Sequence, residues 1–220
     1  MAGITVNGTG VNSGAASGAI ALTAGATNTV TIVVSETGKT PKTYTIAITR
    51  TPATPTATFS FDGANAGKLV GTTLGMEYSL DGTSYSAVTA ADQQLTATQL
   101  AGITATNGIK IRVAAIGSIP VSSVQSITIT TGTTPSALTL STGTATGKVG
   151  VNAATTQEYR VTDTTGATVK QDWTTGTGAA VDTTATCIAG DKVEVRVKAT
   201  GTVQSSAAAS TTVIGGNIGV

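Results

Sequence analysis

Residues 192–198 read Lys-Val-Glu-Val-Arg-Val-Lys, and this stretch decides the fold class. Its valines alternate with charged residues, which is the period-two pattern of a β-strand with one buried and one solvated face. The same alternation occurs in Ile109-Lys-Ile-Arg-Val113. Because antiparallel sheets commonly keep one face dry and one face wet, these segments predict an all-β protein.

A third alternating segment lies near the N-terminus. Tyr44, Ile46 and Ile48 point one way in an extended chain, and threonines 43, 45 and 49 point the other way. We expect a half-buried strand here, with the tyrosine and the two isoleucines in a core.

The composition supports strands over helices. Charged residues make up 10% and aromatic residues 3% of the 220 residues, whereas threonine, valine and glycine are abundant. β-Branched side chains favour the pleated sheet, and glycine favours tight turns. The hydrophobic fraction of 40% and a net charge of +1 oppose a disordered chain.

Several function classes lose support from charge and residue type. The chain has no histidine, which removes the commonest general base and metal ligand, so we expect no enzyme. A net charge of +1 without basic clusters gives no case for nucleic acid. No apolar run approaches the roughly 20 residues that span a bilayer, so we expect no membrane insertion.

Turn signals separate the predicted strands. Asp81-Gly82 stands between the alternating stretches 76–80 and 84–88, and we expect a hairpin with a type I′ turn there. Further turns are expected at 36–39 and 163–166, where Glu-Thr-Gly-Lys and Asp-Thr-Thr-Gly occur.

Two diverged copies of one plan follow residue 53. In the first copy, 67–71 (Gly-Lys-Leu-Val-Gly) precedes Glu77-Tyr78, the strand at 109–113, Gly117 and a Ser-Ser pair at 122. The second copy repeats this order with motifs at 147–151, 158–159, 192–197, 201 and 205–206. Proline-containing segments at 51–55 and 133–135 precede the two copies. Because proline stiffens linkers, we expect these segments to be the joints between modules.

The first 50 residues resemble the second half of the bacterial cadherin-like β-sandwich family. The likeness is carried by Ile4-Thr-Val-Asn-Gly8, Val11-Asn-Ser-Gly14, Leu22-Thr-Ala-Gly25, Asn28-Thr-Val-Thr-Ile-Val-Val34 and Lys42-Thr-Tyr-Thr-Ile-Ala-Ile-Thr-Arg50. Half a sandwich would expose strand edges. We therefore expect the missing strands either earlier in a longer protein, which is the favoured interpretation, or in a neighbouring chain by strand addition.

The two repeats resemble those of large surface proteins of Gram-positive bacteria, including surface-layer (S-layer) proteins. The Glu-Tyr strands and the run Val195-Arg-Val-Lys-Ala-Thr-Gly201 carry this likeness. The predicted organisation is a partial cadherin-like β-sandwich module at 1–52 and immunoglobulin-like β-sandwich repeats at 53–132 and 133–220.

These resemblances imply a structural subunit of a bacterial extracellular assembly at the cell surface, an S-layer or fibre, whose main partner is the chain itself. The alternative is an adhesin or carbohydrate-binding module that contacts cell-wall or host glycans. Trp173, the only tryptophan, is the candidate binding residue as a sugar-stacking platform, although a buried core position is the favoured interpretation.

The remaining candidate residues are few. Cys187 has no partner cysteine and sits in an apolar stretch, so we expect a small buried core residue. Carboxylate pairs such as Glu77 with Asp81 could serve glycoside hydrolysis, but solvated turns are the favoured interpretation. We expect no cofactor; calcium is the one candidate, with Asp62, Asn65 and Asp81 as weak ligands.

Overall fold

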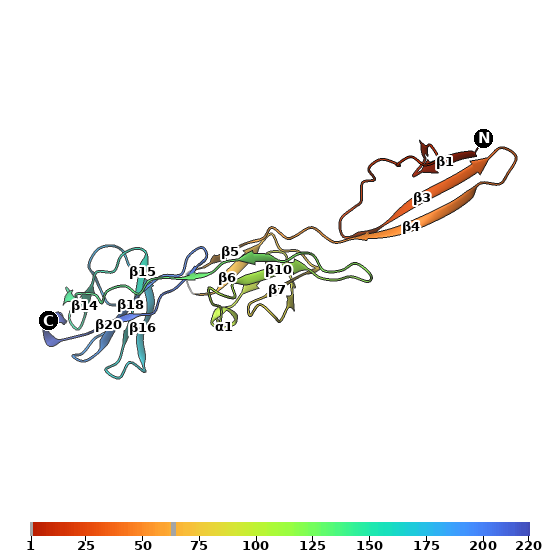
Figure 1. The fold of residues 1–220 in the computed structure, drawn as a ribbon. Coiled ribbons are helices and arrows are strands. Elements are labelled where there is room, and N and C mark those ends of the chain that lie inside the picture. Colours follow the sequence, from red (N-terminus) through yellow and green to blue (C-terminus); the bar gives the residue numbers. More distant parts are fainter. Residues whose placement is uncertain (1, 63–64) are drawn as a thin grey trace.

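The computed structural model describes residues 2–62 and 65–220, and its regular secondary structure is almost entirely β-strand, in three groups along an extended chain (Figure 1). We call the groups the N-terminal sheet (residues 2–50), the middle sandwich (57–131) and the C-terminal sandwich (138–218). The described residues contain one four-residue helix and one 3₁₀ turn, so the all-β prediction is confirmed.

The N-terminal sheet has four antiparallel strands in the order β2-β1-β3-β4. Their bounds are β1 (Ala2–Val6), β2 (Thr9–Val11), β3 (Ala26–Glu36) and β4 (Lys42–Arg50). The turn between β3 and β4 is closed by the Lys39 N–H, which donates to the Glu36 carbonyl at 3.0 Å, as the sequence predicted.

The middle sandwich packs a three-stranded sheet, β5-β6-β9, against a four-stranded sheet, β11-β10-β7-β8. Its elements are β5 (Thr58–Phe61), β6 (Gly67–Val70), β7 (Met76–Ser79), β8 (Ser86–Ala87), β9 (Gln94–Leu95), α1 (Ala97–Leu100), β10 (Ile109–Val113), β11 (Gln125–Ile127) and β12 (Thr130–Thr131). Leu69, Leu95, Leu100, Ile109 and Ile111 are fully buried between the sheets.

The C-terminal sandwich repeats this arrangement, with β13-β14-β17 packed against β16-β15-β18-β20. Its elements are β13 (Ser141–Thr142), β14 (Val149–Val151), β15 (Gln157–Thr162), β16 (Val169–Thr175), β17 (Val181–Asp182), β18 (Lys192–Val197), β19 (Val203–Gln204), β20 (Ala209–Thr212) and η1 (Gly215–Asn217). Cys187 is buried in this core, as predicted.

The repeat equivalence seen in the sequence extends to strand pairing. Tyr78 pairs with Ile111 in the middle sandwich, and Tyr159 pairs with Val195 in the C-terminal sandwich. Both tyrosines are buried. Each sandwich therefore combines three strands and four strands in the immunoglobulin-like manner, with a core built from small aliphatic side chains and few aromatic rings.

The hairpin at Asp81-Gly82 exists, but its turn type was predicted wrongly. Tyr78 pairs with Ser86, so a loop of several residues connects β7 and β8. Only Gly82 has a positive φ (83°) in this loop, whereas a type I′ turn requires two such residues. The Asp81 carboxylate replaces the tight turn by accepting the N–H groups of Thr83 and Ser84.

The expectation of a half-buried β4 is also wrong. Tyr44 and Ile46 are each 48% exposed, although they lie on the apolar face of the sheet. The reason is that the described residues supply no second sheet for the N-terminal group, whereas each repeat packs two sheets around a core.

Candidate functional site

The first candidate site is the surface of the N-terminal sheet. Antiparallel partners share a face, so the pairs Val30–Ile46 and Ile32–Tyr44 place four large apolar side chains together. Ile4, Val6, Val11, Val34 and Ile48 extend the same face through their own pairings. Of these nine residues only Val30 is fully buried. We call this set the open apolar face.

The outer edge of the same sheet has unpaired backbone groups. β4 is the last strand in the order β2-β1-β3-β4, and its nine residues pair with β3 on one side only. Figure 1 shows β4 at the outer margin of the N-terminal group. Long flat edge strands offer unpaired backbone groups to another strand, and β4 carries charges only at its ends, Lys42 and Arg50.

The second candidate site surrounds Trp173 on the outer face of the C-terminal sandwich. The side chain is half-buried and belongs to no core cluster, so the favoured expectation of a core residue is wrong. The pairing of β15 with β16 contains register shifts near Tyr159 and Val161, and such irregularities re-aim side chains.

Two arginines lie over the indole ring. The guanidinium carbons of Arg196 and Arg160 are 3.9 and 4.8 Å from the ring centre. Arg196 donates from Nε to Glu158 Oε1 at 2.6 Å, and Arg160 pairs with Glu194. Cation–π contact and charge-assisted hydrogen bonds thus reinforce each other on this face.

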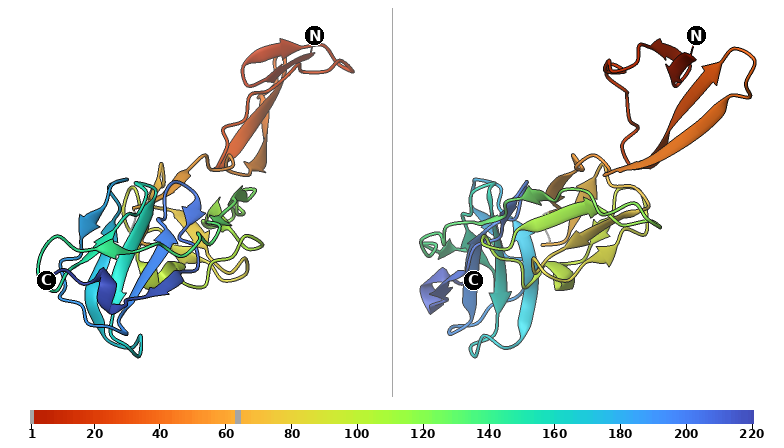
Figure 2. Two further views of the ribbon diagram at one scale, coloured as in Figure 1. Left: turned by 90° about the vertical axis from the view of Figure 1, so that its left-hand side faces the viewer. Right: turned by 45° about the vertical axis from the view of Figure 1, so that its right-hand side comes forward.

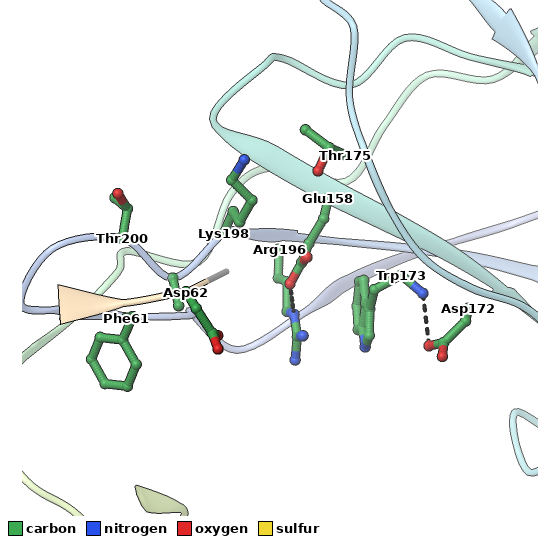
Figure 3. Close-up of a pocket in the computed structure, with 10 residues that line it drawn as sticks. Phe61, Asp62, Glu158, Asp172, Trp173, Thr175, Arg196, Lys198 and Thr200 are labelled. Atoms are coloured by element: carbon green, nitrogen blue, oxygen red, sulfur yellow. Dashed lines mark hydrogen bonds and ion pairs between the residues drawn. The ribbon is translucent and has the colours of Figure 1, made fainter. Parts of the chain in front are cut away.

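A hollow of about 690 Å³ lies beside Trp173 at the junction of the two sandwiches (Figure 3). Phe61 and Asp62 from the middle sandwich line it together with Asp172, Trp173 and Lys198 from the C-terminal sandwich. The hollow thus combines the indole ring with carboxylates and an ammonium group, which can donate and accept hydrogen bonds from a polar ligand.

The middle sandwich contains the counterpart of this stacked arrangement. Arg112 pairs with Glu77 across β10 and β7, and its guanidinium carbon is 3.7 Å from the centre of the Tyr85 ring. Neither cluster is predictable from a sequence motif, because the aromatic residues come from different places in the two repeats. The repetition favours a structural role for the arginine–aromatic stack.

The calcium candidates have other contacts. Asn65 Oδ1 accepts the Ser205 N–H at 3.3 Å, and Asp81 Oδ1 binds the loop of its own hairpin. The N–H groups of Thr83 and Ser84 hold the Asp81 pKa well below its usual range. Asp62 lines the hollow beside Trp173, and its backbone N–H donates to the Ala66 carbonyl. Within residues 2–62 and 65–220, no three acidic, cysteine or histidine side chains form a metal-binding group.

Other carboxylates are also engaged. The Thr165 side chain is the main group that lowers the pKa of Asp163, and the Thr144 N–H does the same for Asp182. Glu77 and Glu158 pair with arginines. The solvated-turn interpretation therefore holds for Asp81 and Asp163 but is wrong for Glu77 and Glu158, which lie on β7 and β15 and form ion pairs.

Comparison with known proteins identifies the N-terminal group. Residues 1–51 match the cadherin-like β-sandwich domain family. The sequence resemblance of this segment is therefore confirmed. Cadherin-like domains are typically extracellular and non-catalytic. The described part of this chain has no helix long and apolar enough to cross a membrane.

Among solved structures, the chain is similar to the crystal structure of domains A168–A170 from titin. The identity is 9% and the TM-score 0.24, over 96% of this chain and 88% of that one. A TM-score of this size is too low to support the fold assignment, which stands on the strand pairing. No curated protein gives a significant match.

Proposed function

We propose that this chain is a structural segment of a bacterial extracellular surface assembly, an S-layer or a fibre, that associates with itself through strand edges and module ends. The observation that carries the proposal is the N-terminal sheet, which combines the open apolar face with the free edge of β4. Two sandwiches in series behind it act as a spacer (Figure 2).

The size of the open apolar face limits what it can do alone. At about 3.4 Å per residue and 4.8 Å between strands, the four strands present roughly 450 Å². Two such faces would bury roughly 900 Å², which is below the roughly 1,200 Å² of a stable specific interface. The face therefore needs edge pairing or repeated contacts in a lattice, where linked sites reinforce each other.

The charge distribution supports association between identical chains. The net charge is +1, so copies of the chain repel one another weakly. The centre of β4 carries no charged residue that would discourage another strand.

Electron microscopy and sedimentation velocity of the purified chain test this proposal. We expect sheets or filaments, or a sedimentation coefficient that rises with concentration between about 1 and 100 μM, the range of weak contacts. A single monomeric species across that range, with and without calcium, would contradict it.

A second candidate function is glycan binding at Trp173, favoured by the hollow beside the ring. A glycan that stacks there would change the fluorescence of the only tryptophan. The test is a glycan array with the wild-type chain, Trp173→Ala and Tyr85→Ala, whose ring stacks on Arg112 in the other sandwich. Binding lost only in Trp173→Ala supports this function, and a blank array opposes it.

A further inference from the structure

The joint between the two sandwiches is closed by one loop, residues 198–205 of the C-terminal sandwich. The Phe61 N–H donates to the Gly201 carbonyl at 2.8 Å, and the Thr130 N–H donates to the Thr202 carbonyl at 3.0 Å. β12 and β19 also pair in parallel. The side chain of Ala199 is 1% exposed and belongs to the core of the middle sandwich.

The middle sandwich carries a loop of the same structure, residues 114–121. A bridge between Ile116 and Ile119 corresponds to the bridge between Thr200 and Val203. Gly117 and Gly201 occupy the same left-handed conformation, with φ of 56° and 54°.

A serine closes both loops in the same way. Ser122 Oγ accepts the Val113 N–H, and Ser206 Oγ accepts the Val197 N–H, each at 2.9 Å. The 114–121 loop is therefore a preformed copy of the loop that closes the sandwich joint.

The two loops differ in what covers them. Ala115 is the counterpart of Ala199, yet it is exposed, and the neighbouring Ile116 is 71% exposed. In the described part of the chain, no backbone hydrogen bond or strand pairing links the N-terminal sheet to either sandwich. The joint between the N-terminal sheet and the middle sandwich, which we call the first joint, is therefore open in this structure. Its 114–121 loop nevertheless has the conformation in which the 198–205 loop docks.

The acceptor for this loop can be located from the joint prolines. Phe59 lies seven positions after Pro52, and Thr142 lies seven positions after Pro135. Phe59 and Thr142 pair with the equivalent residues Leu69 and Val149. Counting back from each proline, residues 47–49 are the counterpart of residues 130–132, which bind the 198–205 loop. Residues 47–49 lie on β4, whose outer edge is free.

We propose that the 114–121 loop docks in parallel onto the edge of β4 at residues 47–49 of the same chain and closes the first joint. The Ala47 N–H donates to the Ser118 carbonyl, and the Thr49 N–H donates to the Pro120 carbonyl. Ala115 and Ile116 then cover the near end of the open apolar face. The short linker around Pro52 keeps the two surfaces at high effective concentration, which favours this contact over one between two chains.

Two substitutions make this contact weaker than the one between the sandwiches. Pro120 replaces Gln204 and has no N–H to donate. Thr49 replaces Gly132, where an added Cβ would lie 3.1 Å from the Val197 side chain. The first joint therefore opens and closes, whereas the sandwich joint stays closed. The contact occupies only residues 47–49 and the near end of the open apolar face, so residues 42–46 of the β4 edge stay free for another chain. The inference therefore neither depends on the proposed assembly function nor excludes it.

Distances between spin labels test the proposal in the full chain, with Cys187 replaced by alanine. Labels at Thr29→Cys and Ser86→Cys report on the first joint, and labels at Ser86→Cys and Ser210→Cys report on the sandwich joint as a control. All three positions are exposed. We expect the distance distribution of the first pair to contain a narrow component, with a width equal to that of the control pair.

Two variants test whether the narrow component comes from docking of the 114–121 loop on β4. Ala115→Glu places a charge in the contact and should remove the narrow component without changing the control pair. Thr49→Gly combined with Pro120→Gln introduces the residues that the sandwich joint has at these positions. This double variant should at least double the fraction of molecules in the narrow component.

A broad distribution that is the same in all variants would overturn the proposal. A narrow component that disappears when labelled protein is diluted into unlabelled protein would assign the contact to a second copy and would also overturn it.

Discussion

The backbone N–H of Phe61 donates to the carbonyl of Gly201 across the boundary between the sandwiches. These residues are far apart in the sequence, and their hydrogen bond fixes the position of one repeat on the other. Two further backbone bonds, from Thr130 to Thr202 and from Gly132 to Gln204, run beside it. The joint is thus a small sheet with a side chain, Ala199, inserted into the neighbouring core.

Ala199→Asp tests this joint. A carboxylate at this buried position has no partner, so we expect the middle sandwich to lose about 3 kcal/mol of unfolding free energy. Urea denaturation measures the loss. Ala105→Asp is the matched control, because it places the same charge in an exposed turn of the same sandwich and should cost less than about 0.5 kcal/mol. Equal losses in both variants would contradict the docking role of Ala199.

The stack around Trp173 gives a second prediction. Arg196→Met leaves the buried Glu158 without its ion-pair partner, and we expect a loss of about 2 kcal/mol together with a shift in tryptophan emission. Arg160→Met should cost clearly less, because its partner Glu194 is more exposed. The reverse order in urea denaturation followed by fluorescence would show that Arg196 is not the main partner of the ring.

Acid stability follows from the aspartates in turns. Hydrogen bonds lower the pKa of Asp81 and Asp163 in the folded state. Their stabilising contribution is complete above the unfolded pKa of about 4 and is lost as the pH falls through the folded pKa. We expect a flat unfolding free energy from about pH 5 to 8 and a decline below about pH 4, reduced in Asp81→Asn with Asp163→Asn. The chain has no histidine, so a main loss between pH 5 and 7 would contradict this account.

The buried thiol provides a probe of core opening. Cys187 is 2% exposed, and its sulfur lies 3.5 Å from Thr183 Oγ1. We expect a thiol reagent to modify it at least about a hundredfold more slowly in buffer than in urea, because modification requires opening of the sandwich. Similar rates in both solutions, measured by absorbance, would place the thiol outside the core.

Local patterns predicted the strands well. The alternation in 109–113 and 192–197 gave β10 and β18, because which residues share a face depends only on the extended backbone. The shared order of Glu-Tyr, Gly and Ser-Ser motifs predicted two equivalent sandwiches. The structure adds that Ser122 and Ser206 make the same hydrogen bonds.

Features that depend on distant partners were not predictable. The alternation in β4 is the same whether or not a second sheet covers it, so the exposure of Tyr44 and Ile46 could not be inferred. Trp173 was misplaced because register shifts between β15 and β16 are not visible in the sequence. The stacks on Arg112 and Arg196 join residues from separate strands, and no short motif contains them.

The central claim is that the open apolar face and the β4 edge bring copies of the chain together. Ile46→Lys places a charge on this face, whereas Thr45→Lys places the same charge on the opposite face of the same strand. Both positions are exposed, so both variants should fold.

Sedimentation velocity over a concentration series of the wild-type chain and these two variants is the most direct measurement. We expect the wild-type chain and Thr45→Lys to form larger species as concentration rises, and Ile46→Lys to remain monomeric or to need at least about tenfold more protein, equivalent to about 1.4 kcal/mol. Association of Ile46→Lys equal to that of the wild-type chain, or no association of the wild-type chain, would contradict the claim.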